Sequence, residues 1–190
     1  MLSVSPSVRA DILGGQHPAV FWIGCSDSRV PPELIAGAEP GELFVLRNIG
    51  NAAPPEDPSA MAALSYAVET LGVSDIVVCG HSDCGAIKAA LSLPAAGPME
   101  TWIAGLRAGL GDVSAFLEGA SDPVRAAAER NVRTQVSRLA ATPSVRARWA
   151  AGAVLRLRGW FYDLVDGRLI ELFPPLTAPT LPQGLAVTVT

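Results

Sequence analysis

Short apolar runs alternate with longer segments of helical periodicity along most of this chain. The runs 19–25, 43–47 and 76–79 are rich in β-branched and aromatic residues and show no clean apolar/polar alternation. Runs of this kind are typical of strands that are buried on both faces of a parallel sheet. The pattern therefore predicts an α/β fold with a mostly parallel central sheet flanked by helices.

Segments with helical spacing separate these strands. Apolar residues recur at helical intervals between 60 and 71, with Ser59 at the position of an N-cap and Gly72 at the position where a glycine commonly ends a helix. We expect further helices at about 100–110, 123–140 and 144–150.

The pattern changes toward the C-terminus. Segments 154–162 and 168–173 have strand composition, and the Asp-Gly pair at 166–167 between them is a turn signal. They predict a C-terminal edge hairpin or a pair of sequential edge strands. Residues 175–190 are punctuated by prolines, so we expect an extended tail there and a single domain over residues 1–174.

Composition excludes several classes of protein. The chain has 190 residues, 49% of them hydrophobic, which is enough for the core of one domain. The net charge is only −4, and no basic block interleaves with aromatic residues, so we expect no nucleic-acid partner. No apolar stretch approaches the roughly 20 residues that span a bilayer, and the N-terminus lacks the order of a signal peptide. The composition predicts a cytoplasmic protein.

Two of the predicted strands end in residues that bind metals. The first runs into residues 25–29 (CSDSR), and the third runs into residues 81–84 (HSDC). Parallel sheets bind ligands beyond the carboxyl ends of their strands, so we expect Cys25 and His81 at one rim of the sheet. Mixtures of cysteine and histidine with a replaceable fourth position are typical of catalytic zinc sites. The sequence predicts that Cys25, His81 and Cys84 bind Zn2+, the alternative being a closed structural zinc site or buried thiols.

The third cysteine has a different setting. Cys79 lies inside an apolar run, which predicts a small buried hydrophobic residue. With an odd number of cysteines and two of them in the metal motifs, we expect no disulfide framework.

Asp27 and Arg29 follow the first ligand closely. Two thiolates weaken zinc as a Lewis acid, so an acceptor for a hydrogen bond from bound water would help the metal to make hydroxide. Asp27 is the nearest candidate, and Arg29 can hold its carboxylate through a bidentate interaction. The alternative is that Asp27 is a turn carboxylate and Arg29 a surface cation. We expect Asp83 to cap the helix that starts near residue 85, and His17 to be an ordinary surface residue.

Three blocks of this sequence carry a family resemblance. Segments 16–31, 41–48 and 80–86 resemble the signature blocks of the β-class carbonic anhydrases, in the same order and at compatible spacings. The similarity runs from about residue 16 to residue 173. The resemblance implies a zinc-dependent lyase that reversibly hydrates carbon dioxide to bicarbonate and a proton by attack of zinc-bound hydroxide. It also implies that Asp27 can leave Arg29 and take the fourth zinc position in a closed state.

The resemblance extends to residues outside the metal motifs. It matches three residues to the substrate pocket of the family, which is partly built across a subunit interface and so implies a homodimer or homotetramer. It matches three hydrogen-bond donors to a site where bicarbonate regulates some bacterial members. Packing would equally explain most of these residues. The pocket residues are Gln16, Phe44 and Tyr66, and the regulatory donors are Trp22, Arg47 and Tyr162.

Other functions stay open at the level of sequence. Relatives of this fold hydrolyse carbonyl sulfide or carbon disulfide with the same zinc chemistry, and a non-catalytic bicarbonate-binding or assembly module is a further alternative. Family members usually carry an N-terminal helical extension, whereas residues 1–15 here contain few helix signals, which predicts a short arm. The sequence is compatible with a free cytoplasmic enzyme, a component of a bacterial microcompartment or a piece of a longer protein.

Overall fold

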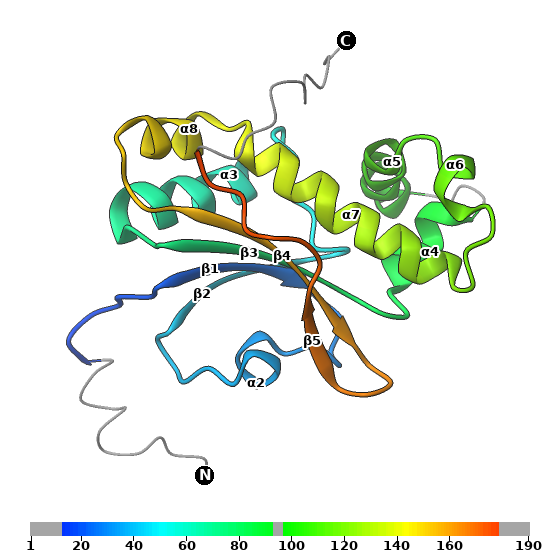
Figure 1. Ribbon diagram of the computed structural model, residues 1–190, viewed down its shortest axis with the longest axis horizontal. Coiled ribbons are helices and arrows are strands. Elements are labelled where there is room, and N and C mark those ends of the chain that lie inside the picture. The colour runs from blue at the N-terminus through cyan, green and yellow to red at the C-terminus, as the bar shows by residue number, and fades with distance from the viewer. Residues whose placement is uncertain (1–12, 93–96, 179–190) are drawn as a thin grey trace.

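A five-stranded sheet forms the centre of the computed structural model, which describes residues 13–92 and 97–178 (Figure 1). The strand order is β2-β1-β3-β4-β5, with the first four strands parallel and β5 antiparallel to β4. The fold class and the C-terminal hairpin predicted from the sequence are thus confirmed. The strands are β1 (Val20–Cys25), β2 (Leu43–Asn48), β3 (Asp75–His81), β4 (Arg156–Asp163) and β5 (Arg168–Glu171).

Burial explains the different patterns of the strands. Every residue of β3 is buried, and five of the six residues of β1 are buried, as expected for the inner strands of a sheet covered on both faces. In β4 buried and half-buried residues alternate, because one of its faces is only partly covered. The edge strand β2 is mostly half-buried.

Helices cover the two faces of the sheet unequally. The long helix α7 crosses one face together with α3 and α8, whereas α2 lies on the opposite side (Figure 1). Helices α4, α5 and α6 gather at one end of α7. None of the helices in the described part of the chain is both long and apolar enough to cross a membrane. The helices are α2 (Pro32–Ala36), α3 (Pro58–Ser65), α4 (Gly85–Leu91), α5 (Pro98–Leu110), α6 (Ser114–Leu117), α7 (Pro123–Ala140) and α8 (Pro143–Ala150).

The helix expected over residues 60–71 differs in two ways. Its N-cap is Asp57, whose side chain accepts from the Ser59 amide, so the prediction of Ser59 as the cap was wrong. Asp57 takes this role because proline at 58 occupies the first helical position, where its missing N–H costs nothing. The second half, Tyr66–Leu71, is a π-helical segment, η1, and Gly72 ends it at φ 68° as predicted.

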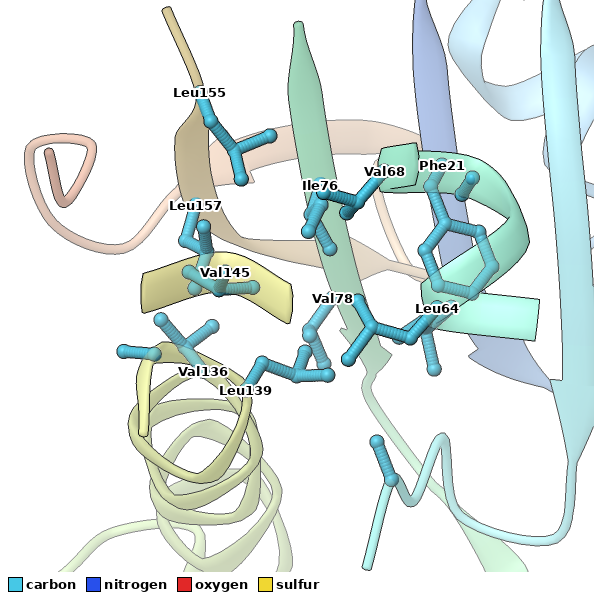
Figure 2. Packing of buried hydrophobic residues seen from close by; sticks show 14 of the residues in the cluster. Phe21, Leu64, Val68, Ile76, Val78, Val136, Leu139, Val145, Leu155 and Leu157 are labelled. Carbon is cyan, nitrogen blue, oxygen red and sulfur yellow. The ribbon is translucent and has the colours of Figure 1, made fainter. Parts of the chain in front are cut away.

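The main hydrophobic core lies between the sheet and the helices α3, α7 and α8. Figure 2 shows side chains from β1, β3 and β4 interleaved with those of the helices. A second cluster lies under α4 and α5 and includes the two motif cysteines, and a third lies on the other face of the sheet. The labelled residues of the main core are Phe21, Leu64, Val68, Ile76, Val78, Val136, Leu139, Val145, Leu155 and Leu157.

The described part of the C-terminal segment returns to the sheet. Leu176 forms an isolated antiparallel bridge with Leu157, with backbone hydrogen bonds of 3.0 and 2.8 Å. The rest of the predicted tail, residues 179–190, and the predicted short arm up to residue 12 lie outside the described residues.

Candidate metal centre

The three predicted ligands meet at one rim of the sheet. Cys25 is the last residue of β1, His81 is the last residue of β3, and Cys84 directly precedes α4. Because β1 and β3 are adjacent and parallel, their carboxyl ends place these side chains together. Their ligand atoms all lie within 4.8 Å of one another, and all three residues are buried.

The spacing of the two sulfur atoms suits zinc. The Sγ atoms of Cys25 and Cys84 are 4.0 Å apart. In a tetrahedral site with Zn–S bonds of about 2.3 Å, two sulfurs lie about 3.8 Å apart. Two thiolates and one imidazole match the ligand set of catalytic zinc sites that keep one position for water or substrate. The residues therefore fit a zinc ion.

The orientation of His81 also points to a metal. Its Nδ1 lies 2.8 Å from the carbonyl oxygen of Ser82, which can only accept, so Nδ1 carries the proton. The Nε2 atom is buried and has no hydrogen-bond partner. A metal-binding histidine usually has its other ring nitrogen fixed by such a carbonyl, which leaves the lone pair of Nε2 for the ion.

The surroundings favour thiolate at this site. The Cys84 thiol, and more weakly His81 and the backbone amides of Gly50 and Asp27, lower the pKa of Cys25 to about 4. The same contact with Cys25 raises the pKa of Cys84. Repulsion between two thiolates this close together opposes deprotonation of both thiols. A bound divalent cation would offset that repulsion, so that both sulfurs could be thiolates.

Asp27 and Arg29 form the predicted pair. Nε of Arg29 donates to Oδ1 of Asp27 at 3.0 Å, and Nη2 donates to Oδ2 at 2.7 Å. The backbone amide of Arg29 adds a third hydrogen bond at 3.0 Å. The Arg29 guanidinium holds the pKa of the Asp27 carboxyl well below its usual range, so Asp27 is an ionised acceptor at neutral pH.

Asp83 has a different role from the one predicted. Its backbone is left-handed (φ 60°), and its carboxylate accepts from Nη1 of Arg29 at 3.0 Å and from Lys88. The residue at the N-cap of α4 is Cys84, and no side chain caps this helix. The prediction that Asp83 caps the helix was wrong because two cations flank its carboxylate and bind it instead.

Two of the three predicted pocket residues, Phe44 and Tyr66, lie away from the metal ligands of their own chain. Phe44 is paired in register with Phe21, four residues before Cys25, which is about 13 Å along the strand. The rings of Phe44 and Tyr66 contact each other with centroids 5.7 Å apart, and Tyr66 is 43% exposed. Gln16 is exposed, as is His17, which agrees with the prediction of a surface histidine.

The regulatory donors predicted from the sequence come from three different strands, β1, β2 and β4. Trp22 is buried, edge-on to Trp160 at 5.8 Å, with its Nε1 close above Gly24. Arg47 donates to the carbonyl oxygens of Cys25 (2.9 Å) and Asp27 (2.7 Å). Arg47 therefore supports the backbone of the metal-binding loop, a contact that the sequence did not reveal.

The remaining member of the trio is half-buried in the hairpin. The hydroxyl of Tyr162 lies near Gly167, at the turn between β4 and β5. Trp22 and Tyr162 belong to the same hydrophobic cluster, on the face of the sheet opposite α7.

A narrow recess on this face adjoins the metal ligands. It has essentially no room for a water molecule, and neither Arg47 nor Tyr162 lines it. Cys79 lines it as a 4% exposed thiol whose pKa is raised by burial, in agreement with the prediction of a buried hydrophobic residue. The lining residues are Trp22, Gly24, Cys25, Val30, Ile35, Cys79, Gly80 and His81.

Sequence reasoning missed a buried polar pair behind the site. Asn131 and Gln135 of α7 are 1% and 0% exposed and bond to the loop that follows β2. The sequence could have indicated this pair, because two amide residues four positions apart lie among the apolar positions of this helix.

Known proteins resemble this chain over most of its length. A family model described as carbonic anhydrase matches residues 20–169. A carbonic anhydrase of Pseudomonas aeruginosa is 45% identical over 168 residues, which cover 83% of this chain and 74% of that protein. A carbonic anhydrase of Emericella nidulans is 37% identical over 177 residues, covering 88% of this chain and 76% of that protein.

Solved structures agree with these relatives. A tetrameric β-carbonic anhydrase from Sordaria macrospora superposes with a TM-score of 0.84 at 37% identity, covering 90% of this chain and 89% of the other. The Coccomyxa β-carbonic anhydrase in complex with acetazolamide gives a TM-score of 0.86 at 38% identity, covering 90% and 79%. The similarity therefore extends from sequence to fold.

Proposed function

The chain belongs to the β-class carbonic anhydrases, which reversibly hydrate carbon dioxide to bicarbonate and a proton, and we propose that Cys25, His81 and Cys84 hold the zinc ion for this reaction. The observation that carries the proposal is the buried cluster in which a ring nitrogen of His81 and the sulfurs of Cys25 and Cys84 lie within 4.8 Å of one another, together with the buried Nε2 of His81 that has no hydrogen-bond partner. Zinc bound there supplies the Lewis acid that turns water into a nucleophile at neutral pH.

The neighbouring residues of the chain prepare the water. Asp27, ionised through its pair with Arg29, accepts a hydrogen bond from the reacting water and orients it toward the carbon of carbon dioxide. Arg29 keeps the carboxylate in place with two hydrogen bonds. Release of Asp27 from Arg29 would let the carboxylate bind zinc itself, which is the closed state that we propose as the inactive form.

Metal analysis combined with stopped-flow hydration of carbon dioxide tests the assignment. Purified protein should contain about one zinc per chain, and Cys25→Ser, His81→Ala and Cys84→Ser should each lose it together with activity. Cys79→Ala is the matched control, because it removes the third buried cysteine without removing a ligand. Zinc retained by all three ligand variants would overturn the assignment.

Gln16, Phe44 and Tyr66 are proposed to act in the active site of a partner subunit. Their support is that Phe44 and Tyr66 lie away from the metal ligands of their own chain while Tyr66 is 43% exposed. The Sordaria macrospora neighbour, described as tetrameric, supports an oligomer of at least two chains.

Subunit complementation distinguishes shared from separate sites. One chain would carry His81→Ala and the other Phe44→Ala with Tyr66→Ala, so that neither is active alone. A statistical mixture of dimers should recover about a quarter of wild-type activity, since half of the dimers contain one intact composite site. No recovery by verified mixed dimers would show that each site is built from one chain.

Trp22, Arg47 and Tyr162 are proposed to bind regulatory bicarbonate. Support comes from the resemblance, from the shared cluster of Trp22 and Tyr162, and from Arg47, which links this region to the loop that carries Asp27. The relatives named above are all carbonic anhydrases, so hydrolysis of carbonyl sulfide or carbon disulfide and a non-catalytic assembly role are not favoured. The cytoplasmic location stays a prediction from the sequence.

A further inference from the structure

A cavity lies between α3 and the corner where α7 passes into α8. Its volume of about 440 Å³ falls within the roughly 300–1,000 Å³ typical of sites for small molecules. None of the three metal ligands lines it, so it is separate from the site described above. Its wall is mostly apolar and includes one charged residue. The lining residues are Pro55, Met61, Leu64, Ser65, Arg138, Ala141, Thr142, Pro143 and Ser144.

Arg138 is the charged residue of this cavity, and it has few partners within the protein. Its Nη1 lies 3.5 Å from Oε1 of Gln135, which is long for a hydrogen bond, and this oxygen already accepts from the amide of Ala53 at 3.0 Å. Arg138 forms no ion pair with any residue in the described part of the chain. A guanidinium carries several N–H donors, so most donors of Arg138 are left for water or a ligand.

Packing against α5 holds this guanidinium in position. A Cβ added at Gly109 of α5 would lie 3.0 Å from Nη2 and 3.4 Å from Cζ of Arg138, so the glycine leaves the space into which the guanidinium packs. Glycine weakens a helix relative to alanine, but an alanine here would press on the guanidinium. A cation that is already held by its surroundings loses little further side-chain freedom when it binds an anion.

The helices around the cavity are basic, although the chain as a whole has a net charge of −4. Helix α7 contains four arginines and α8 contains two, against a single acidic residue, Glu129, and α3 has no charged residue. Glu129 is paired with Arg125. In the described part of the chain, the one carboxylate bonded to the cavity wall is that of Glu69, which accepts from Ser144. The local charge therefore favours an anionic ligand.

We propose that this cavity binds a small organic carboxylate, whose anionic group pairs with Arg138 and whose apolar body lies against Met61, Leu64 and Pro143. A guanidinium matches a carboxylate through two parallel hydrogen bonds, which are strong and fix the orientation of the ligand. A neutral apolar molecule would fill the cavity but leave Arg138 without a partner. A phosphate would bring more charge than one guanidinium compensates, and its oxygens would face an apolar wall. The proposal is independent of the zinc assignment.

Two probes of similar shape test the charge and the cavity together. The anion 1-naphthoate and its uncharged amide, 1-naphthamide, would be titrated into the purified full chain and followed by ligand-observed NMR. Arg138→Met removes the cation. Arg133→Met is its matched control, since Arg133 lies on the same helix but donates to the carbonyl of Leu172 at 3.1 Å. Ala141→Phe fills part of the cavity without a change of charge.

We expect naphthoate to bind the wild type with a dissociation constant on the order of 1 mM, the affinity of a ligand with about a dozen non-hydrogen atoms. It should bind about tenfold more tightly than the amide, because its hydrogen bonds to Arg138 are charge-assisted. In Arg138→Met the acid and the amide should bind almost equally, whereas Arg133→Met should keep the wild-type ratio. Ala141→Phe should weaken both probes to a similar degree.

Each contrary outcome would overturn the proposal. An acid-to-amide ratio that stays at the wild-type value in Arg138→Met would place the carboxylate on another cation, such as a bound metal. A lack of saturable binding to the wild type would show that the cavity is closed in the assembled protein. Undiminished binding to Ala141→Phe would place the probes outside the cavity. If Ala141→Phe does not fold, the ratio in Arg138→Met decides alone.

Discussion

Arg29 and Asp83 are paired across the metal-binding loops, with Nη1 of Arg29 donating to Oδ2 of Asp83 at 3.0 Å. The opposite edge of the same guanidinium holds Asp27. Lys88 binds the other oxygen of Asp83. Arg29 is thus held between two carboxylates, and Asp83 restrains the residue that restrains Asp27.

This arrangement predicts a small but specific effect of Asp83. Asp83→Asn should lower kcat by no more than about fivefold, because ion pairs exposed to solvent contribute little. Asp166→Asn makes the same change of charge at another exposed pair and should have no effect. Equal stopped-flow rates for the two variants would show that Asp83 does not help to hold Arg29.

Replacing Asp27 should lower kcat far more than replacing Asp83. Asp27→Asn keeps the shape but removes the charge that pairs with Arg29 and accepts from water. We expect zinc to stay bound and kcat to fall by roughly 10²–10⁴, the contribution of a positioned proton acceptor. A turnover number within twofold of wild type, measured at saturating carbon dioxide with full zinc content, would reduce Asp27 to a turn residue.

Regulation by bicarbonate is best tested at Trp22. Because Arg47 also bonds to the carbonyls of Cys25 and Asp27, Arg47→Ala would disturb the metal loop as well as any anion site. Trp22→Phe removes the indole N–H together with some buried volume, and keeps an aromatic ring beside Trp160.

In wild type, bicarbonate should inhibit more strongly as pH falls, because protons and the anion would favour the same closed state. Trp22→Phe should lose this bicarbonate dependence and keep its uninhibited rate. Activity measured against pH at matched ionic strength, with and without bicarbonate, checks both statements. Identical wild-type profiles would exclude the regulatory site.

Asp75 lies at the start of β3, at the end of the sheet opposite the metal ligands, and should make the stability of the fold depend on pH. Burial raises the pKa of Asp75, but hydrogen bonds from Arg156 and Arg158 outweigh it and lower the value to about 2, against an ordinary value of 3.8. As pH falls, Asp75 therefore takes up a proton at a higher pH in the unfolded chain than in the folded protein. The stabilisation is fully present above about pH 4 and is lost as pH falls through about 2.

We expect this group to contribute about 1–2 kcal/mol to the free energy of unfolding after solvent screening. Asp75→Asn should be destabilised near pH 6 and should lose part of the decline that wild type shows between pH 4 and 2. Urea unfolding at several pH values measures this, with Asp166→Asn as the control. Parallel curves for wild type and Asp75→Asn would contradict the prediction.

The sequence by itself determined the sheet and the ligand set. Short apolar runs rich in β-branched residues favour strands with both faces covered, and parallel strands bring their carboxyl ends to one rim, so Cys25 and His81 were expected at the same rim. Asp27 and Arg29 are two residues apart, and their pairing is a local contact that spacing alone can predict.

Tertiary structure decided the contacts between residues far apart in the chain. Asp83 was predicted to be a helix cap because its partner Arg29 is 54 residues away in sequence. Asn131 and Gln135 were missed because the loop that they bind is about 80 residues away. Local spacing predicts contacts within one turn or strand, where the backbone sets the distances. Contacts between α7 and the loop after β2 depend instead on how whole elements pack, because only packing sets which buried donor meets which acceptor.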